Sequence, residues 1–346
     1  MNDIHWDRFP LIAQSLSARA WLTIQANLRL ASNTVDAYGR SLEDFFAFSA
    51  AHSVSPSTAT REHMALYVHD LSVRPVKRKT KSVVPDPVAY LSNATMQLRL
   101  TAIRLYYDYL IEEGIRTNNP VGRGRYTPRN AFACERGLIP RYRKLPWIPD
   151  DEQWRRILEE MRVEPVRNRF MLALAYDAAL RRQELCGLEV GDIDPARRLI
   201  RIRPETTKNR RERVVPYSEA TGVLFSCYLQ VRREFSRERG PLFLSQSRRN
   251  KAQPISIWTW SKIIEEVAQR TGALQFTTHT PRHLCLTDLA RIGWDIHEIA
   301  RFAGHQSTET TLLYIHLSGR DLAEKLARST ASLHSWRLNL MKEVLV

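Results

Sequence analysis

The stretch Ala179-Leu180-Arg181-Arg182-Gln183-Glu184-Leu185 lies where an apolar helix ends and a second helical segment begins. The apolar residues of 170–180 predict the first helix, and two arginines follow it at once. By itself the stretch is an ordinary helix boundary with charged side chains. Its significance depends on the charged and aromatic residues that lie on either side of it along the chain.

Outward from this stretch, the chain is predicted to be mainly α-helical with one small β-hairpin. The hairpin is predicted because 199–203 and 213–217 alternate β-forming residues around a polar turn at 206–211. Apolar residues recur at three- and four-residue spacing in the other segments. The helices expected from this spacing cover 16–30, 34–51, 60–71, 94–113, a segment from 151, 219–235, 256–271, 281–292, 295–303, 307–317 and 320–345.

The length of 346 residues suits two domains better than one core. Prolines and glycines recur from 119 to 149 and break any helical periodicity, so this segment is the predicted linker. The expected division is a helical domain over 1–118, a basic linker over 119–149 and a second domain over 150–346 that ends in a helix over 320–346.

The net charge is +15 and the isoelectric point is near 10.0, and both halves of the chain are basic. An extended polyanion is therefore the expected partner, with nucleic acid first, and a merely solubilising surface charge is the weaker interpretation. Apolar runs such as 171–176 are too short to cross a bilayer, and no secretory signal is visible. Four scattered cysteines without a Cys-x-x-Cys pair fit a reducing cytosol and argue against a zinc ribbon.

Several basic side chains in loops are candidate contacts to a phosphate backbone. They lie in the proline-rich segment 74–87, in the linker and in the turn of the hairpin. For the first of these segments, a solvated surface loop is an equally good interpretation. The candidate DNA-binding residues are Lys77, Arg78, Lys79, Arg123, Arg125, Arg129, Arg141, Arg143, Lys144, Arg210 and Arg211.

Lys208 is the only lysine between Lys144 and Lys251 in a segment rich in arginine. A lysine can be tuned to act as an acid, whereas an arginine keeps its proton near neutrality. Lys208 is therefore a candidate proton donor to a leaving oxygen. Taken alone, a chance lysine that contacts phosphate is the better interpretation.

The segment Thr278-His279-Thr280-Pro281-Arg282-His283 is the second group of candidate site residues. Thr280 is the expected N-cap and Pro281 the first helical residue, and a helix N-terminus favours an anion. Arg282 adds a planar fork of donors. A metal site is not expected, because Arg282 lies between the two histidines and the glutamate of zinc proteases is missing after His279. A capped helix with surface histidines stays a fair alternative.

Gly304-His305 precedes a probable cap at Ser307 and a short helix that contains Tyr314. Tyr314 is the only tyrosine after Tyr228. A single tyrosine on such a helix is usually a core residue whose hydroxyl is satisfied. Alone, that interpretation would be preferred.

Taken together and in order, Arg181, Lys208, His279, Arg282, His305 and Tyr314 closely resemble the catalytic set of the tyrosine recombinases, the phage-integrase family. The family pattern has Gly-Leu-Arg-x-x-Glu-Leu, a hairpin lysine, His-x-x-Arg, Gly-His and a tyrosine nine residues after that histidine. The resemblance covers about 150–320 and extends loosely to the first domain. Departures from the pattern are Ala179 for glycine and Pro281 and Ala303 for leucine.

The resemblance implies a two-domain, C-shaped clamp, with a SAM-like helical core-binding domain and a mainly helical catalytic domain. It implies double-stranded DNA as partner, a dimer on each site and a tetramer in synapsis, and no cofactor, metal or membrane. A place in the bacterial cytoplasm, associated with the nucleoid, follows from the same resemblance. The C-terminal segment would dock on a neighbouring protomer, although packing on its own domain is nearly as good an interpretation.

The resemblance also implies a mechanism in which Tyr314 attacks a DNA phosphate and forms a 3′-phosphotyrosine. Arg181 and Arg282 would hold the non-bridging oxygens, and Lys208 would protonate the leaving 5′-oxygen. His279 and His305 would hydrogen-bond the phosphate, and either could relay the proton of Tyr314. Glu184 would orient Arg181 or cap a helix. The alternatives are a type IB topoisomerase and a catalytically silent DNA-binding protein of the same fold.

Overall fold

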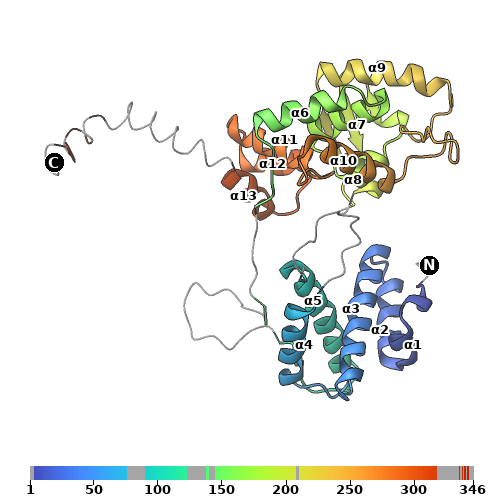
Figure 1. Ribbon diagram of the computed structural model, residues 1–346, viewed down its shortest axis with the longest axis vertical. Coiled ribbons are helices and arrows are strands. Elements are labelled where there is room, and N and C mark those ends of the chain that lie inside the picture. The colour runs from blue at the N-terminus through green and yellow to red at the C-terminus, as the bar shows by residue number, and fades with distance from the viewer. Residues whose placement is uncertain are drawn as a thin grey trace. The chain divides into compact units, whose positions relative to one another are not determined.

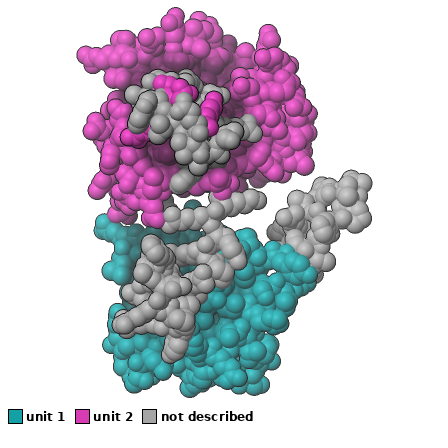
Figure 2. Space-filling model, turned by 90° about the vertical axis from the view of Figure 1, so that its left-hand side faces the viewer, with its two compact units in different colours: residues 1–144 teal, residues 145–346 magenta. Residues whose placement is uncertain are grey.

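The computed structural model describes residues 4–75, 90–122, 138–139, 145–207, 210–317 and the single positions 335, 337, 339, 341 and 342. The chain forms two compact units, residues 1–144 and 145–346 (Figures 1 and 2). The described residues are mostly helical with one small antiparallel sheet, which confirms the predicted fold class. None of their helices combines the length and the apolarity needed to cross a membrane.

The described residues of unit 1 form helices, apart from an isolated bridge between Pro75 and Tyr90. Its helices are α1 (Pro10–Gln14), α2 (Leu16–Asn27), α3 (Ser32–Ala51), α4 (Arg61–Val73) and α5 (Asn93–Glu112). The four long helices are those predicted, whereas the short α1 was missed. It is stabilised by a long-range contact that a sequence window does not contain, because the Glu43 carboxylate accepts hydrogen bonds from the backbone N–H groups of Leu11 and Ile12.

The core of unit 1 is aromatic. Phe45 on α3 packs edge-on against Tyr67 on α4, with ring centroids 5.3 Å apart, and against Tyr107 on α5 at 6.2 Å. Val121 and Ile139, from the segment predicted as the linker, are also buried in this core. Parts of that segment therefore pack with the helical unit.

Unit 2 contains the predicted hairpin and helices. Its elements are α6 (Asp151–Met161), α7 (Val166–Asp177), α8 (Arg182–Cys186), β1 (Ile193–Asp194), β2 (Leu199–Ile202), β3 (Arg213–Pro216), α9 (Glu219–Arg233), α10 (Ile257–Thr271), α11 (Thr280–Arg291), α12 (Ile296–Ala303) and α13 (Thr308–Leu317). The strands lie in the order β1-β2-β3 and are antiparallel, and Arg201 on β2 pairs with Val214 on β3. The two-residue strand β1 was not predicted, since a segment so short carries no alternating pattern.

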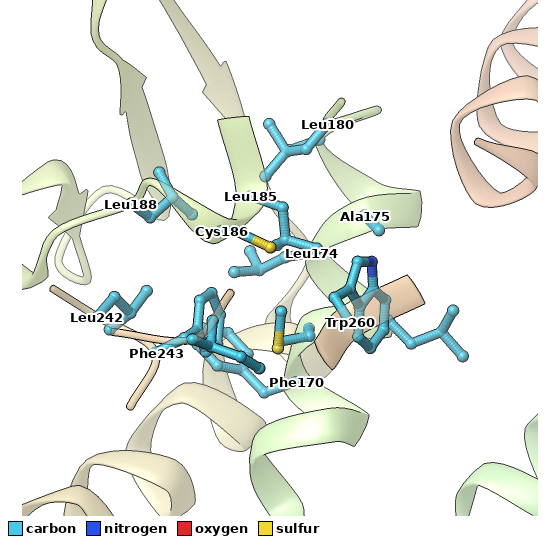
Figure 3. Packing of buried hydrophobic residues seen from close by; sticks show 14 of the residues in the cluster. Phe170, Leu174, Ala175, Leu180, Leu185, Cys186, Leu188, Leu242, Phe243 and Trp260 are labelled. Carbon is cyan, nitrogen blue, oxygen red and sulfur yellow. The ribbon is translucent and has the colours of Figure 1, made fainter. Parts of the chain in front are cut away.

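The core of unit 2 is centred on α7, which packs against both α9 and α11 (Figure 1). Phe170 on α7 is fully buried against Phe243, and Trp260 from α10 closes the same cluster (Figure 3). Burial of one such phenylalanine contributes about 1.5–3 kcal/mol to stability. The end of α7 is thereby held rigidly where the chain turns into Arg181.

The expected N-cap of α11 was wrong by one residue. The N-cap is His279, and Thr280 is already helical, with its hydroxyl accepting a hydrogen bond from the backbone N–H of Thr277. Pro281 lies in the first turn, as expected, where its missing N–H costs nothing. The predicted helix over 320–346 lies mostly outside the described residues.

Candidate active site

The segments that carry the predicted catalytic residues come together in unit 2. Arg181 lies between α7 and α8, Arg282 on the first turn of α11, His305 between α12 and α13, and Tyr314 on α13. The packing of α11 against α7, α12 and α13 brings these side chains close together. Lys208 lies outside the described residues, so its place in the hairpin stays a prediction.

Glu184 is the anchor of this group. Its side chain is fully buried, and its carboxylate accepts hydrogen bonds from the backbone N–H and from Nη1 of Arg181, both at 2.9 Å. Arg213 donates to both carboxylate oxygens, from Nη1 at 3.1 Å and from Nη2 at 2.7 Å. Although burial raises the pKa of Glu184, its bonds to Arg213 and Arg181 lower it to about 2. Glu184 therefore holds the Arg181 side chain and caps α8.

Arg213, on β3, was missed by the sequence analysis, which singled out its neighbours Arg210 and Arg211. Its Nε donates to the carbonyl of Phe302 at 3.1 Å, so it ties the hairpin to the end of α12. Gly304 follows with φ of +63°, and a Cβ there would lie 3.0 Å from Nη1 of Arg213. Both facts explain the glycine before His305. The sequence did offer a signal for Arg213, because it is a basic residue in the same predicted hairpin as Lys208, five residues later.

Arg282 is almost fully buried, and none of its hydrogen bonds within the described residues goes to a carboxylate. Its Nη1 donates to the carbonyl of Ala179, and its Nη2 donates to the carbonyl of Ala303 at 2.7 Å and lies 3.0 Å from Nε2 of His305. Burial, together with the positive charge of Arg181, lowers the pKa of Arg282 to about 10. The guanidinium is thus still charged at neutral pH, and its position is set by backbone carbonyls.

These three guanidinium groups leave a surplus of positive charge. In the part of the chain that the structure describes, Glu184 is the one carboxylate that Arg181 and Arg213 both contact, and Arg282 contacts none. A partly buried group of cations with too few anions is stabilised by an incoming anion. The geometry therefore suits a phosphate.

His305 is neutral and its tautomer is set by its neighbours. Arg282 can only donate, so Nε2 of His305 accepts from it, and Nδ1 carries the proton toward Thr311 Oγ1 at 2.9 Å. Burial and the nearby charges of Arg282, Arg181 and Arg213 lower the pKa of His305 to about 3. In this arrangement His305 helps to orient Arg282.

Tyr314 is 2% exposed and packs in an apolar cluster that includes Leu286 and Ile299, while its hydroxyl contacts a polar side chain. Its ring is nearly parallel to that of His305, with an angle of 7° and a centroid distance of 6.0 Å. Its hydroxyl lies 3.0 Å from Nδ1 of His283, a residue that the sequence analysis considered only as a metal ligand. Burial raises the pKa of Tyr314, although Arg282 and Arg181 oppose this effect. The hydroxyl is therefore protonated at rest.

His279 lies at the edge of the cluster. Its side chain is exposed, and its ring centroid is 6.4 Å from that of His283. Partial desolvation and the charges of Arg182, Arg282 and Arg181 lower its pKa. The ring of His283 is therefore the neighbour through which His279 adjoins Tyr314 and Arg282.

Most of the predicted DNA-binding residues cannot be placed. Arg210 and Arg211 are exposed in the turn before β3. The others lie outside the described residues: Lys77, Arg78, Lys79, Arg123, Arg125, Arg129, Arg141, Arg143 and Lys144. Within the described ranges, no three His, Cys, Asp or Glu side chains gather as a metal would require.

The sequence pattern of the Phage integrase family matches residues 149–320, and that of the Phage integrase, N-terminal SAM-like domain matches residues 21–114. The tyrosine recombinase XerC of Haemophilus influenzae Rd is 30% identical over 237 residues, which cover 68% of this chain and 74% of that protein. The chain belongs to the phage-integrase family of tyrosine recombinases.

One further relative and one solved structure resemble the chain. Tyrosine recombinase XerC of Corynebacterium glutamicum is 32% identical over 161 residues, 46% of this chain, and the match spans half of that protein. The crystal structure of XerH site-specific recombinase bound to a palindromic difH substrate has the same fold, with a TM-score of 0.60 at 19% identity. That match covers 85% of this chain and 79% of the XerH chain.

The departures from the family pattern are accommodated locally. Ala179 has φ of +47°, a left-handed conformation in which glycine has no steric cost, and its carbonyl is held by Arg282. Ala303 is fully buried and offers its carbonyl to the same guanidinium. Neither replacement removes a functional group from the site.

The depressed pKa of Glu184 predicts how stability depends on pH. A pKa that folding lowers from 4.5 to about 2 contributes about 3 kcal/mol above pH 4.5, and this is lost as the pH falls toward 2. In Glu184→Gln, the free energy of unfolding is expected not to decrease by this amount between pH 4.5 and pH 2. Urea titrations between pH 2 and pH 6 measure it, with the exposed Glu219→Gln as control. Parallel curves for wild type and Glu184→Gln would contradict the assignment.

Proposed function

We propose that the chain is a site-specific DNA recombinase that cleaves and rejoins strands through a covalent 3′-phosphotyrosine at Tyr314. The observation that carries the proposal is the hydroxyl of Tyr314 close to the guanidinium groups of Arg282 and Arg181, which carry a surplus of positive charge. A protein that only bound DNA would have no need of a nucleophile held beside these cations.

In the proposed reaction, the oxygen of Tyr314 attacks the scissile phosphorus and displaces the 5′-oxygen. The covalent link conserves the energy of the phosphodiester bond, so a 5′-hydroxyl of another strand can reverse the step. Strand exchange therefore proceeds without ATP. The groups named here complete it without a metal.

Arg181 and Arg282 would stabilise the added negative charge of the pentacoordinate transition state. Both are held in place before DNA binds, Arg181 by Glu184 and Arg282 by two carbonyls. One such preorganised donor is worth about 3–4 kcal/mol.

The remaining roles complete the proposal. Lys208 would protonate the leaving 5′-oxygen. His279 would hydrogen-bond the phosphate, and His305, whose Nε2 accepts from Arg282, would keep that guanidinium directed at it.

On the scale of the whole molecule, we propose that the helical domain 1–118, the basic linker 119–149 and the catalytic domain 150–346 close as a clamp around duplex DNA. Dimers would form on each site and tetramers in synapsis. The natural substrate would be the DNA of a mobile element in the cytoplasm of a bacterium, at its nucleoid.

Sequencing of the DNA trapped on the protein tests this proposal directly. Cells that express the chain are lysed under denaturing conditions, and the covalent adducts are digested and sequenced together with the attached peptide. The expected result is one recurrent DNA junction on the peptide that contains Tyr314. Adducts spread over all sequences, with relaxation of any supercoiled plasmid, would indicate a topoisomerase instead.

Binding of DNA is expected to weaken steeply with salt, because each phosphate contact releases a counterion. Between 50 and 200 mM salt the affinity should fall by about 10³-fold, as for about six phosphate contacts. Replacement of Lys77, Arg78 and Lys79 by serine should lower the slope of log K against log salt by about 3. Fluorescence anisotropy measures it, with Arg197→Ser, in the β1–β2 turn, as control. An unchanged slope would remove this segment from the interface.

A further inference from the structure

Nδ1 of His283 lies 3.0 Å from the hydroxyl oxygen of Tyr314. Among the described histidines, His283 is the only one whose imidazole is within hydrogen-bonding distance of this hydroxyl. The two rings come from different helices, α11 and α13, and their centroids are 5.8 Å apart. A protonated phenol donates its hydrogen, so Nδ1 of a neutral His283 is the acceptor. The proton of the nucleophile therefore already points at a base.

The other two histidines of the cluster are less suited to take this proton. His305 is in parallel contact with the phenol ring, and both of its nitrogens are engaged, one with Arg282 and the other with Thr311. His279 is exposed, and its ring centroid is 6.4 Å from that of His283. Among the described residues, His283 is the nitrogen base beside the phenol oxygen.

The position of His283 is rigid. Its backbone N–H donates to the carbonyl of His279 at 3.0 Å, and its own carbonyl accepts from Thr287 Oγ1 at 2.8 Å within α11. The neighbouring Arg282 is anchored to the carbonyls of Ala179 and Ala303. The base and the phosphate-binding guanidinium are therefore presented by one fixed helical turn.

We propose that His283 is a catalytic residue that accepts the phenolic proton of Tyr314 as this oxygen attacks the DNA phosphate. The inference rests on the function proposed above. The O–H bond of Tyr314 breaks and an N–H bond forms at Nδ1, while the Oη–P bond forms and the P–O5′ bond breaks. The 5′-oxygen takes a proton from Lys208. On religation each proton returns to its donor, so the cycle is balanced.

The charges around His283 support this role. Burial, with His279 and Arg282, lowers its pKa to about 4, so the ring is neutral and able to accept a proton. The groups that face it are His279 and Arg282 on α11, Tyr314 on α13, and His305 before α13. A bound phosphate would offset the positive charges and make the imidazole more basic at the moment of attack.

Two variants separate proton transfer from hydrogen bonding. His283→Asn places an amide close to where Nδ1 lies, so it can accept the hydrogen bond but cannot take the proton. On a nicked suicide duplex that carries the sequence recovered from the cellular adduct, we expect cleavage about 10²–10³-fold slower and unchanged DNA affinity. His297→Asn, exposed on α12, is the matched control and should cleave at the wild-type rate.

Fluorinated tyrosine at position 314 provides the decisive comparison. 3,5-Difluorotyrosine releases its proton more readily, so it needs a base less. We expect this fluorinated tyrosine to restore most of the cleavage rate that His283→Asn loses. In the protein that keeps His283, we expect it to change the cleavage rate little. Cleavage by His283→Asn within about three-fold of wild type, or slow cleavage that fluorination does not restore, would overturn the proposal. Absence of adducts from the wild-type protein would instead refute the function itself.

Discussion

Tyr314→Phe is expected to abolish covalent protein–DNA adducts and to leave DNA affinity within about two-fold of wild type. Loss of a nucleophile removes on the order of 10⁶ in rate in a well-studied hydrolase, and no other hydroxyl lies beside the three guanidiniums within the described residues. The phenylalanine ring keeps the parallel contact with His305. Denaturing gels of a suicide duplex measure the adduct, and anisotropy measures the binding.

The Tyr314→Phe variant should still fold. It loses the hydrogen bond to His283, which is worth about 1 kcal/mol, and the contact of the hydroxyl with Arg282. A thermal denaturation midpoint close to that of wild type would show this. Adducts that persist in Tyr314→Phe, with a midpoint unchanged, would refute the assignment of the nucleophile.

Arg181→Lys is expected to lower the rate of cleavage by about 10²–10³-fold, which corresponds to the loss of one preorganised donor. Arg181 donates a hydrogen bond from Nη1 to Glu184, while its Nη2 lies 3.5 Å from the carbonyl oxygen of Gly304. The planar guanidinium can therefore hold Glu184 and offer further donors at the same time. A lysine ammonium is a point charge and cannot keep the bond to Glu184 while it also holds a phosphate in a bidentate manner. Single-turnover cleavage under saturating protein measures the effect.

Arg291→Lys is the matched control, because Arg291 ends α11 and pairs with Asp288 away from the cluster. It should cleave at the rate of wild type. If Arg181→Lys cleaves as fast as this control, Arg181 is not part of the machinery. A lower affinity with an unchanged maximal rate would assign it to binding alone.

The fold was largely predictable because its signals are local. The helices α3 and α5 repeat apolar residues at helical spacing, and β2 and β3 alternate around a polar turn, so each pattern lies within one window of sequence. The elements that were not predicted, α1 and β1, carry no such local pattern. Helix α1 depends on Glu43, more than thirty residues away, and β1 exists through its pairing with Leu199 and Ile200.

The residues of the predicted site could be picked out for the same reason. Arg181, Arg282, His305 and Tyr314 were found from short motifs in a set order, and the structure brings them together. Glu184, expected to orient Arg181 or to cap a helix, contacts Arg181. The sequence analysis gave the exposed His279 the same role as His305, a hydrogen bond to the phosphate. The motif itself did not distinguish His279 from His283, four residues later.

By itself, the sequence determined which reactive groups the chain carries, in what order, and on which kinds of element. Only the tertiary structure decided which of them touch: Arg213 on Glu184, 29 residues away, and His283 on Tyr314, 31 residues away. Motifs record residue types along one helix or strand. Contacts between side chains depend on how α11 packs on α7 and α13 on α11, and on how β3 meets α8 and α12, and that packing is set by the shape of the whole core.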